Sequence, residues 1–119
     1  MKLKLHQALD SVESLNILAA KNLPAVLSFK MAKVLKKISE ELKMFDEIRT
    51  KKASELGKIS DDGKEYIFSD ENRKKFSDEV RELLLSDISI PGEQVKISEL
   101  GDIQMEPRYL ALLDWLIVE

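Results

Sequence analysis

Three lysines are the residues whose type and spacing come nearest to chemistry in this chain. Lys30, Lys33 and Lys37 follow one another at steps of three and four residues, so on a helix they share one face, beside Lys36. Ammonium groups on one face attract phosphate and carboxylate groups. In two aligned copies of the helix they would form a site for an anionic nucleotide, a phosphate or an acidic protein surface. The alternative is a lysine-rich face turned to solvent.

The other reactive residue types are poorly placed for catalysis or metal binding. His6 is the only histidine, so no second imidazole is available for a metal pair or a catalytic set. Neighbouring carboxylates such as Glu40 and Glu41 point about 100° apart on a helix and make no dyad. The four glycines are scattered singly, and there is no cysteine. We therefore expect no enzymatic activity, no cofactor and no metal.

The acidic stretch around Asp61 and Asp62 has some likeness to a calcium-binding loop. With Gly63 in the sixth place of such a loop, Lys58 would be its first ligand and Ser69 its twelfth. An EF-hand needs an aspartate and a glutamate at these places. The stretch therefore predicts a turn.

The lysines belong to a stretch that predicts one long amphipathic helix, from Pro24 to Leu56. Proline is tolerated in a first helical turn, and no further proline or glycine occurs before Gly57, where a C-terminal cap is expected. Apolar residues recur mostly at steps of three and four, which predicts a single stripe. They are Leu27, Met31, Val34, Ile38, Leu42, Phe45, Ile48 and Leu56.

The length of this helix predicts association. Its 33 residues make a rod of roughly 50 Å, whereas a compact globule of this size is only about 35 Å across. The helix must overhang a monomeric core or be packed along its length by another chain. We expect the second, in a homodimer or larger oligomer, with an interface that includes the apolar residues Leu27, Met31, Val34, Trp115 and Leu116.

Shorter elements are predicted on either side of the long helix. Residues 1–5 alternate as an edge strand, and 7–21 have helical spacing up to the corner before Pro24. The Asp62-Gly63 turn predicts a hairpin between Ile59 and residues 66–68. A helix over about 71–86, capped by Ser69 or Asp70, should then lie antiparallel to the end of the long helix.

The last third of the chain changes period twice. Residues 87–90 and 95–100 alternate around a Pro-Gly turn and predict a second hairpin, to which Leu3 and Leu5 could add a third strand. Residues 108–118 predict a helix that is apolar all round, docked in the core or lying in an interface. The fold class is therefore mainly α with minor β. A long central helix in an antiparallel helical hairpin, a small two- or three-stranded antiparallel sheet and a C-terminal helix form one domain, 1–119.

Composition restricts the partners and the compartment. Charged residues make up 34% of the chain but the net charge is only −3, which disfavours general nucleic-acid binding. Neither a signal peptide nor a membrane-spanning apolar run is found, and the lack of cysteine fits a cytoplasmic protein. The charge is uneven, since residues 21–58 carry +5 and 59–119 carry −8. The two parts could complement each other within the fold, or the basic part could face a partner.

The chain resembles a family of small uncharacterised helical proteins of bacteriophages and prophages of Gram-positive bacteria. The resemblance lies in the start at residues 1–5, then 23–25, 30–33, Glu41-Leu42 and 47–49, and later in 97–100 and Glu106-Pro107 with Leu110 and Leu113. It implies a phage setting and a mostly helical fold, without a mechanism. Phage proteins of this size are often assembly helpers or inhibitors of host and defence enzymes.

Together these observations predict a non-enzymatic interaction protein of the host-cell cytoplasm. It would act as a helical oligomer that binds a host or phage protein, as an inhibitor or as an assembly factor. The alternative is a sponge that holds an anionic nucleotide at Lys30, Lys33 and Lys37 between subunits.

Overall fold

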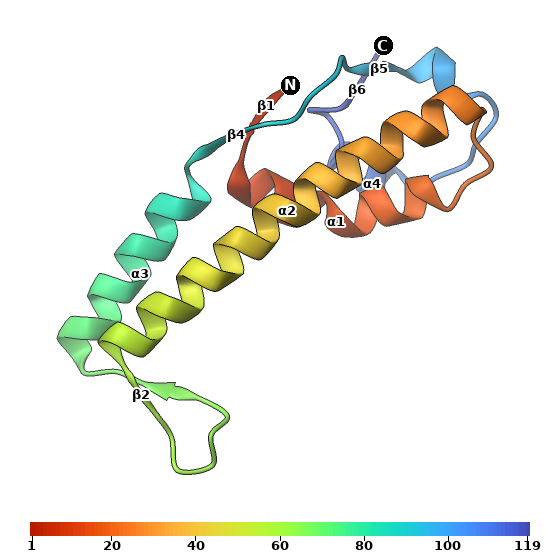
Figure 1. The fold of residues 1–119 in the computed structure, drawn as a ribbon. Helices are drawn as coiled ribbons and strands as arrows, with labels where there is room; N and C mark the ends of the chain where they lie inside the picture. The colour runs from red at the N-terminus through yellow and green to blue at the C-terminus, as the bar shows by residue number, and fades with distance from the viewer.

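Helix α2 (Ala25–Leu56) sets the shape of the molecule (Figure 1). In the computed structural model, which describes all of residues 1–119, it is one unbroken helix of 32 residues, as predicted. The molecule measures 52 × 28 × 23 Å. Its radius of gyration of 17.7 Å exceeds the roughly 13.5 Å of a compact globule of the same length, so the protein is a rod.

Two shorter helices lie end to end along α2 (Figure 1). Helix α1 (Leu5–Ala19) runs back along its first half and α3 (Asp70–Leu84) along its second half. The two meet where the Leu5 N–H donates to the Ser86 carbonyl at 3.0 Å. The chain thus covers one side of the long helix by itself. The length of α2 alone therefore does not require the second chain that we expected.

The hydrophobic core lies at one end of the rod. The first half of α2 buries Leu27, Met31, Val34 and Ile38, whereas after Ile38 only Ala53 is buried. No residue of α3 is fully buried, although Phe76, Val80, Leu83 and Leu84 are half-buried. We call residues 39–84, which comprise the second half of α2, a hairpin and α3, the arm.

The strands form three separate pairs. They are β1 (Lys2–Lys4) with β4 (Asp87–Ser89), β2 (Lys58–Ile59) with β3 (Tyr66–Ile67), and β5 (Val95–Lys96) with β6 (Ile117–Val118). The first two pairs are antiparallel and the third is parallel. The hairpin predicted around Asp62-Gly63 is confirmed as β2–β3, with Gly63 at φ +72°.

The predicted hairpin between residues 87–90 and 95–100 is wrong. β4 pairs with β1 alone, and Ile97–Leu100 is a 3₁₀ helix, η1. The pairing with β1 lets Leu3 and Ile88 both enter the core, and it is closed by the amino group of Met1, which donates to the Ile90 carbonyl at 2.7 Å. These distant contacts outweigh the local turn.

The predicted helix over 108–118 is much shorter than expected. α4 (Pro107–Ala111) has five residues, and the chain then continues through turns into β6. Leu113, Trp115 and Leu116 are all buried, but on a helix residues 113 and 115 would point about 200° apart. Turning the chain lets all three side chains enter the core, so the tail docks on its own molecule.

Candidate protein-binding surfaces

The three lysines of the predicted anion site do not converge on one point. The Lys33 ammonium lies over the ring of Phe29, 4.4 Å from its centroid, and the Lys37 ammonium is 3.1 Å from the Glu41 carboxylate. Lys30 is half-buried beside Gly92. Lys30 and Lys33 share a hollow of about 420 Å³ with Phe29, but Lys37 does not line it. Within one chain the predicted site is therefore incomplete.

The five apolar residues that we assigned to an interface lie inside the protein. Leu27, Met31, Val34, Trp115 and Leu116 are all buried in the core of the single chain. They are covered because α1 and the C-terminal tail take the place that we had given to a second copy. In the single chain these five side chains are therefore not accessible to a partner.

The first exposed apolar surface is at the start of α2, on the side away from the core. Val26 is 86% exposed and Phe29 is 65% exposed. They stand among lysines, since residues 21–37 contain five lysines and no acidic residue. Glu93, across the hollow, is the one acidic side chain that lines this surface. We call Val26 and Phe29, together with Lys21, Lys30, Lys33 and Lys36, the basic end.

The second surface is a hollow of about 710 Å³ at the far end of the arm. Its apolar walls are Leu56, Ile59, Ile67 and Phe68, and the two isoleucines are 61% exposed. The hollow lies within residues 55–72, which carry six acidic and two basic residues. We call these residues the acidic tip.

The acidic tip holds its charge and its shape. The Ser60 hydroxyl and then the Lys64 N–H donate to the Asp62 carboxylate, and these hydrogen bonds lower the pKa of Asp62 below its usual 3.8. Phe68 stacks on Phe76 of α3 with 5.0 Å between ring centroids. These contacts fix the hairpin on the two helices, so the hollow is formed before any partner arrives.

Asn72 and Gly57 join the hairpin to the helices. The side-chain amide of Asn72 donates to the Leu56 carbonyl at 2.9 Å, across the end of the long helix. Gly57 lies so close to Phe68 that an added Cβ would stand 2.8 Å from the ring. The turn from α2 into the hairpin therefore depends on a residue without a side chain.

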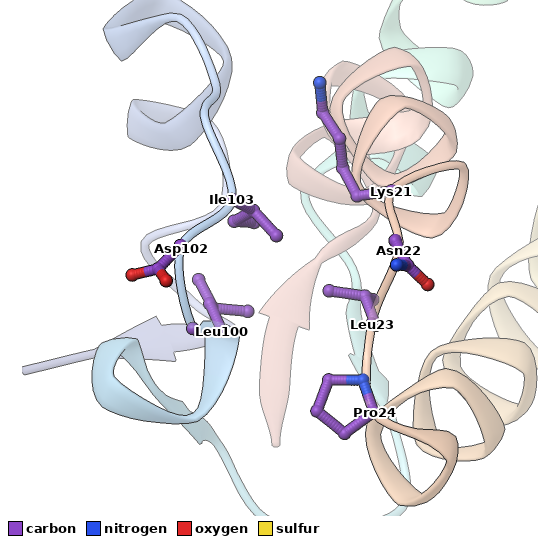
Figure 2. Close-up of a pocket in the computed structure, with 8 residues that line it drawn as sticks. Lys21, Asn22, Leu23, Pro24, Leu100, Asp102 and Ile103 are labelled. Atoms are coloured by element: carbon purple, nitrogen blue, oxygen red, sulfur yellow. The ribbon is translucent and has the colours of Figure 1, made fainter.

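A further cleft of about 630 Å³ separates the corner between α1 and α2 from the loop after η1 (Figure 2). Leu23, Leu100 and Ile103 point toward the gap, while the Lys21 ammonium and the Asp102 carboxylate point away from it. An apolar gap whose two charged groups face apart offers no acid–base pair to a substrate.

The titratable groups with a clearly shifted pKa are few and lie on different elements. Besides Asp62, only two groups have a clearly shifted pKa, and both are exposed. The hydrogen bond from Lys4 lowers the pKa of Asp87, and the hydrogen bond to Glu106 raises the pKa of Arg108. No group of three or more histidine, aspartate or glutamate residues could hold a metal ion. No helix is both long enough and apolar enough to cross a membrane.

Sequence reasoning found most of the lysines of the basic end, but it missed the exposed apolar residues Val26 and Phe29 beside them and the acidic tip as a surface. Val26 and Phe29 fall outside the apolar stripe of α2, and this displacement was the available signal. Ile59 and Ile67 were assigned to strands, but nothing in a hairpin pattern tells which apolar residues stay uncovered.

No known protein family, no curated protein and no solved structure matches this chain.

Proposed function

We propose that this protein is a non-enzymatic interaction protein, a helical oligomer that binds another protein through the two ends of its rod. The observation that carries the proposal is the exposure of Val26 and Phe29 at one end and of Ile59 and Ile67 at the other. Single exposed apolar residues are ordinary, but here lysines predominate around Val26 and Phe29, and acidic residues outnumber basic ones six to two in the segment that carries Ile59 and Ile67. An apolar centre with a polar rim is the usual anatomy of a protein interface.

The setting of this binding follows from the resemblance to phage proteins and stays part of the proposal. In that setting the partner is a host or phage protein in the cytoplasm of the infected cell. The protein would block a host or defence protein, or help a phage structure to assemble. The rod shape supports either role, because its two ends present separate surfaces on one stiff helix.

Photo-crosslinking tests the proposal directly. A photoreactive phenylalanine analogue is introduced at Phe29 or at Ile67, and in matched controls at Lys43 or Ser77, which are exposed polar positions of α2 and α3. In cells of the natural host, positions 29 and 67 should give discrete adducts on illumination, and the controls should not. Equal labelling at all four positions would contradict the proposal.

A second function, the binding of an anionic nucleotide, is supported by the hollow that Lys30 and Lys33 share with Phe29. A base could stack on the Phe29 ring once the Lys33 ammonium moves from it to the phosphate. Thermal unfolding with a panel of nucleotides tests this function. A ligand at about 100 times its dissociation constant adds about 2.7 kcal/mol of stability. Unchanged melting temperatures across the panel would exclude it.

A further inference from the structure

The two ends of the rod carry opposite charge and lie too far apart to neutralise each other. The basic end has four lysines, and the acidic tip has six acidic and two basic residues. Two of the six carboxylates, Glu55 and Glu71, pair with Lys52 and Lys75 just outside the tip, and the other four have no ion-pair partner. The 28 residues of helix from Phe29 to Leu56 separate them by about 40 Å, and physiological salt screens charges beyond about 8 Å. Figure 1 shows the hairpin and the start of α2 at opposite ends. These two regions do not complement each other within one chain.

The two ends also differ in shape. At the basic end, Val26 and Phe29 are largely exposed on α2 and line one side of a smaller hollow of about 420 Å³. At the acidic tip, Leu56, Ile59, Ile67 and Phe68 line a hollow of about 710 Å³, which is in the size range of pockets that enclose a small ligand. The hollow at the acidic tip therefore has room for the side chains that are exposed at the opposite end.

We propose that copies of this protein associate head to tail, with the basic end of one copy seated in the acidic tip of the next. Val26 and Phe29 enter the hollow against Ile59 and Ile67, and the lysines around them face the acidic residues of the tip. The inference rests on the proposed function and names a second copy of the chain as the partner of both ends.

Charge disfavours pairing between like ends. Two basic ends in contact would bring eight lysines together, and two acidic tips would bring together eight carboxylates without an ion-pair partner, four from each copy. Like charges placed face to face across an interface cost several kcal/mol, whereas opposite charges speed and orient association. Because the two contacting surfaces are different, an assembly of any size still has one free basic end and one free acidic tip. It therefore grows as a chain, or closes as a ring when these two meet.

The contact is small and therefore weak. The rod is 28 × 23 Å across, so an end-on contact covers about 500 Å² per copy, at the lower limit of specific interfaces. Light scattering from about 10 μM to 1 mM should thus show a mass that rises from that of one 13.6 kDa copy as concentration increases. A constant monomer mass over this range would overturn the proposal.

Mixing two variants is the decisive experiment. Phe29→Glu disables the basic end, and Ile67→Glu disables the acidic tip; each variant alone should stay monomeric, with self-association weakened at least about tenfold. The variants mixed one to one should form a complex of two copies and no larger species, because one intact end of each kind remains. Leu85→Glu, at an exposed leucine between α3 and β4, should associate like the wild type.

The possible outcomes separate this inference from the proposed function. Circular dichroism first verifies that each variant keeps its helical content. A mixture that stays monomeric, or a single variant that still associates, would overturn the head-to-tail contact. If crosslinking at Phe29 and Ile67 nevertheless labels other proteins, the proposed function stands without this contact. If the two positions label nothing, both fail.

Discussion

The hydroxyl of Ser11 ties helix α1 to the C-terminal tail, and its removal is the sharpest test of the core. The buried indole N–H of Trp115 donates to Ser11 Oγ at 2.8 Å. The hydroxyl itself donates to the Gln7 carbonyl at 2.6 Å, with the Leu112 carbonyl also in reach at 3.0 Å. Ser11→Ala would therefore leave the N–H of Trp115 buried without an acceptor.

The expected loss of stability follows from that unpaired group. A buried donor that loses its partner costs about 1 to 3 kcal/mol, out of a total of roughly 5 to 15 kcal/mol for a domain. At roughly 4 °C per kcal/mol for a chain of this size, the melting temperature should fall by about 4 to 12 °C. Urea unfolding followed by the fluorescence of Trp115, the only tryptophan, measures the same change.

Ser14 provides the matched control. It lies three residues further along the same helix and is as fully buried as Ser11, but its hydroxyl has no hydrogen-bond partner. Removing an unpaired hydroxyl costs no hydrogen bond, so Ser14→Ala should be neutral or stabilising. If Ser14→Ala destabilises the protein as much as Ser11→Ala, packing rather than the hydrogen bond explains the loss, and the reasoning is refuted.

Three further perturbations test other parts of the structure. Gly57→Ala would place a Cβ 2.8 Å from the Phe68 ring, so we expect the hairpin to shift and to be cleaved faster by protease, whereas unchanged cleavage would speak against the close contact. The hydrogen bond from Lys4 holds the pKa of Asp87 in the folded protein below 3.8. The ionised carboxylate therefore contributes its full stability above pH 3.8, and this stability is lost as the pH falls through the lower pKa of the folded protein. Asp87→Asn should thus have a lower urea midpoint than wild type near neutral pH and the same midpoint in acid. A difference that persists in acid would show that the ion pair with Lys4 does not cause the loss of stability. Deletion of residues 109–119 removes three fully or nearly buried large side chains, worth roughly 5 to 9 kcal/mol together, and should unfold the protein; a folded truncation by circular dichroism would show that the tail is dispensable.

The elements with local causes were predictable from the sequence. The long helix follows from the interval without proline or glycine between Pro24 and Gly57, and the β2–β3 hairpin from Asp62-Gly63. The N-terminus of α3 follows from Ser69, whose hydroxyl accepts the Asn72 N–H at 3.2 Å. In each case the deciding interaction lies within a few residues of the pattern.

The elements that depend on distant partners were not predictable. Pairing of β4 with β1 joins residues more than 80 positions apart, so the alternation of residues 87–90 and 95–100 favoured a nearer partner that the fold does not use. The apolar tail resembled a helix because composition does not tell that Leu113 and Trp115 must face the same way.

The candidate surfaces were harder to predict from the sequence than the strand pairing. A stripe of apolar residues predicts burial but does not say whether the covering element belongs to the same chain. For this reason Leu27, Met31 and Val34 were assigned to an interface, while α1 covers them in the structure. Val26 and Phe29 can be recognised as a surface only once the covered side of α2 is known.

The uneven depth of packing along α2 gives one helix two degrees of protection from solvent exchange. Amide hydrogens from Ser28, the first that is hydrogen-bonded, to Ile38 lie over the core and should exchange with deuterium only when the whole molecule unfolds. Those beyond it lie in the arm, where Ala53 alone is buried, and should exchange through a separate opening in which α3 swings away. The acidic tip is then carried on the part of the rod that opens most easily, and whatever occupies its hollow should slow deuterium uptake along the far half of the helix.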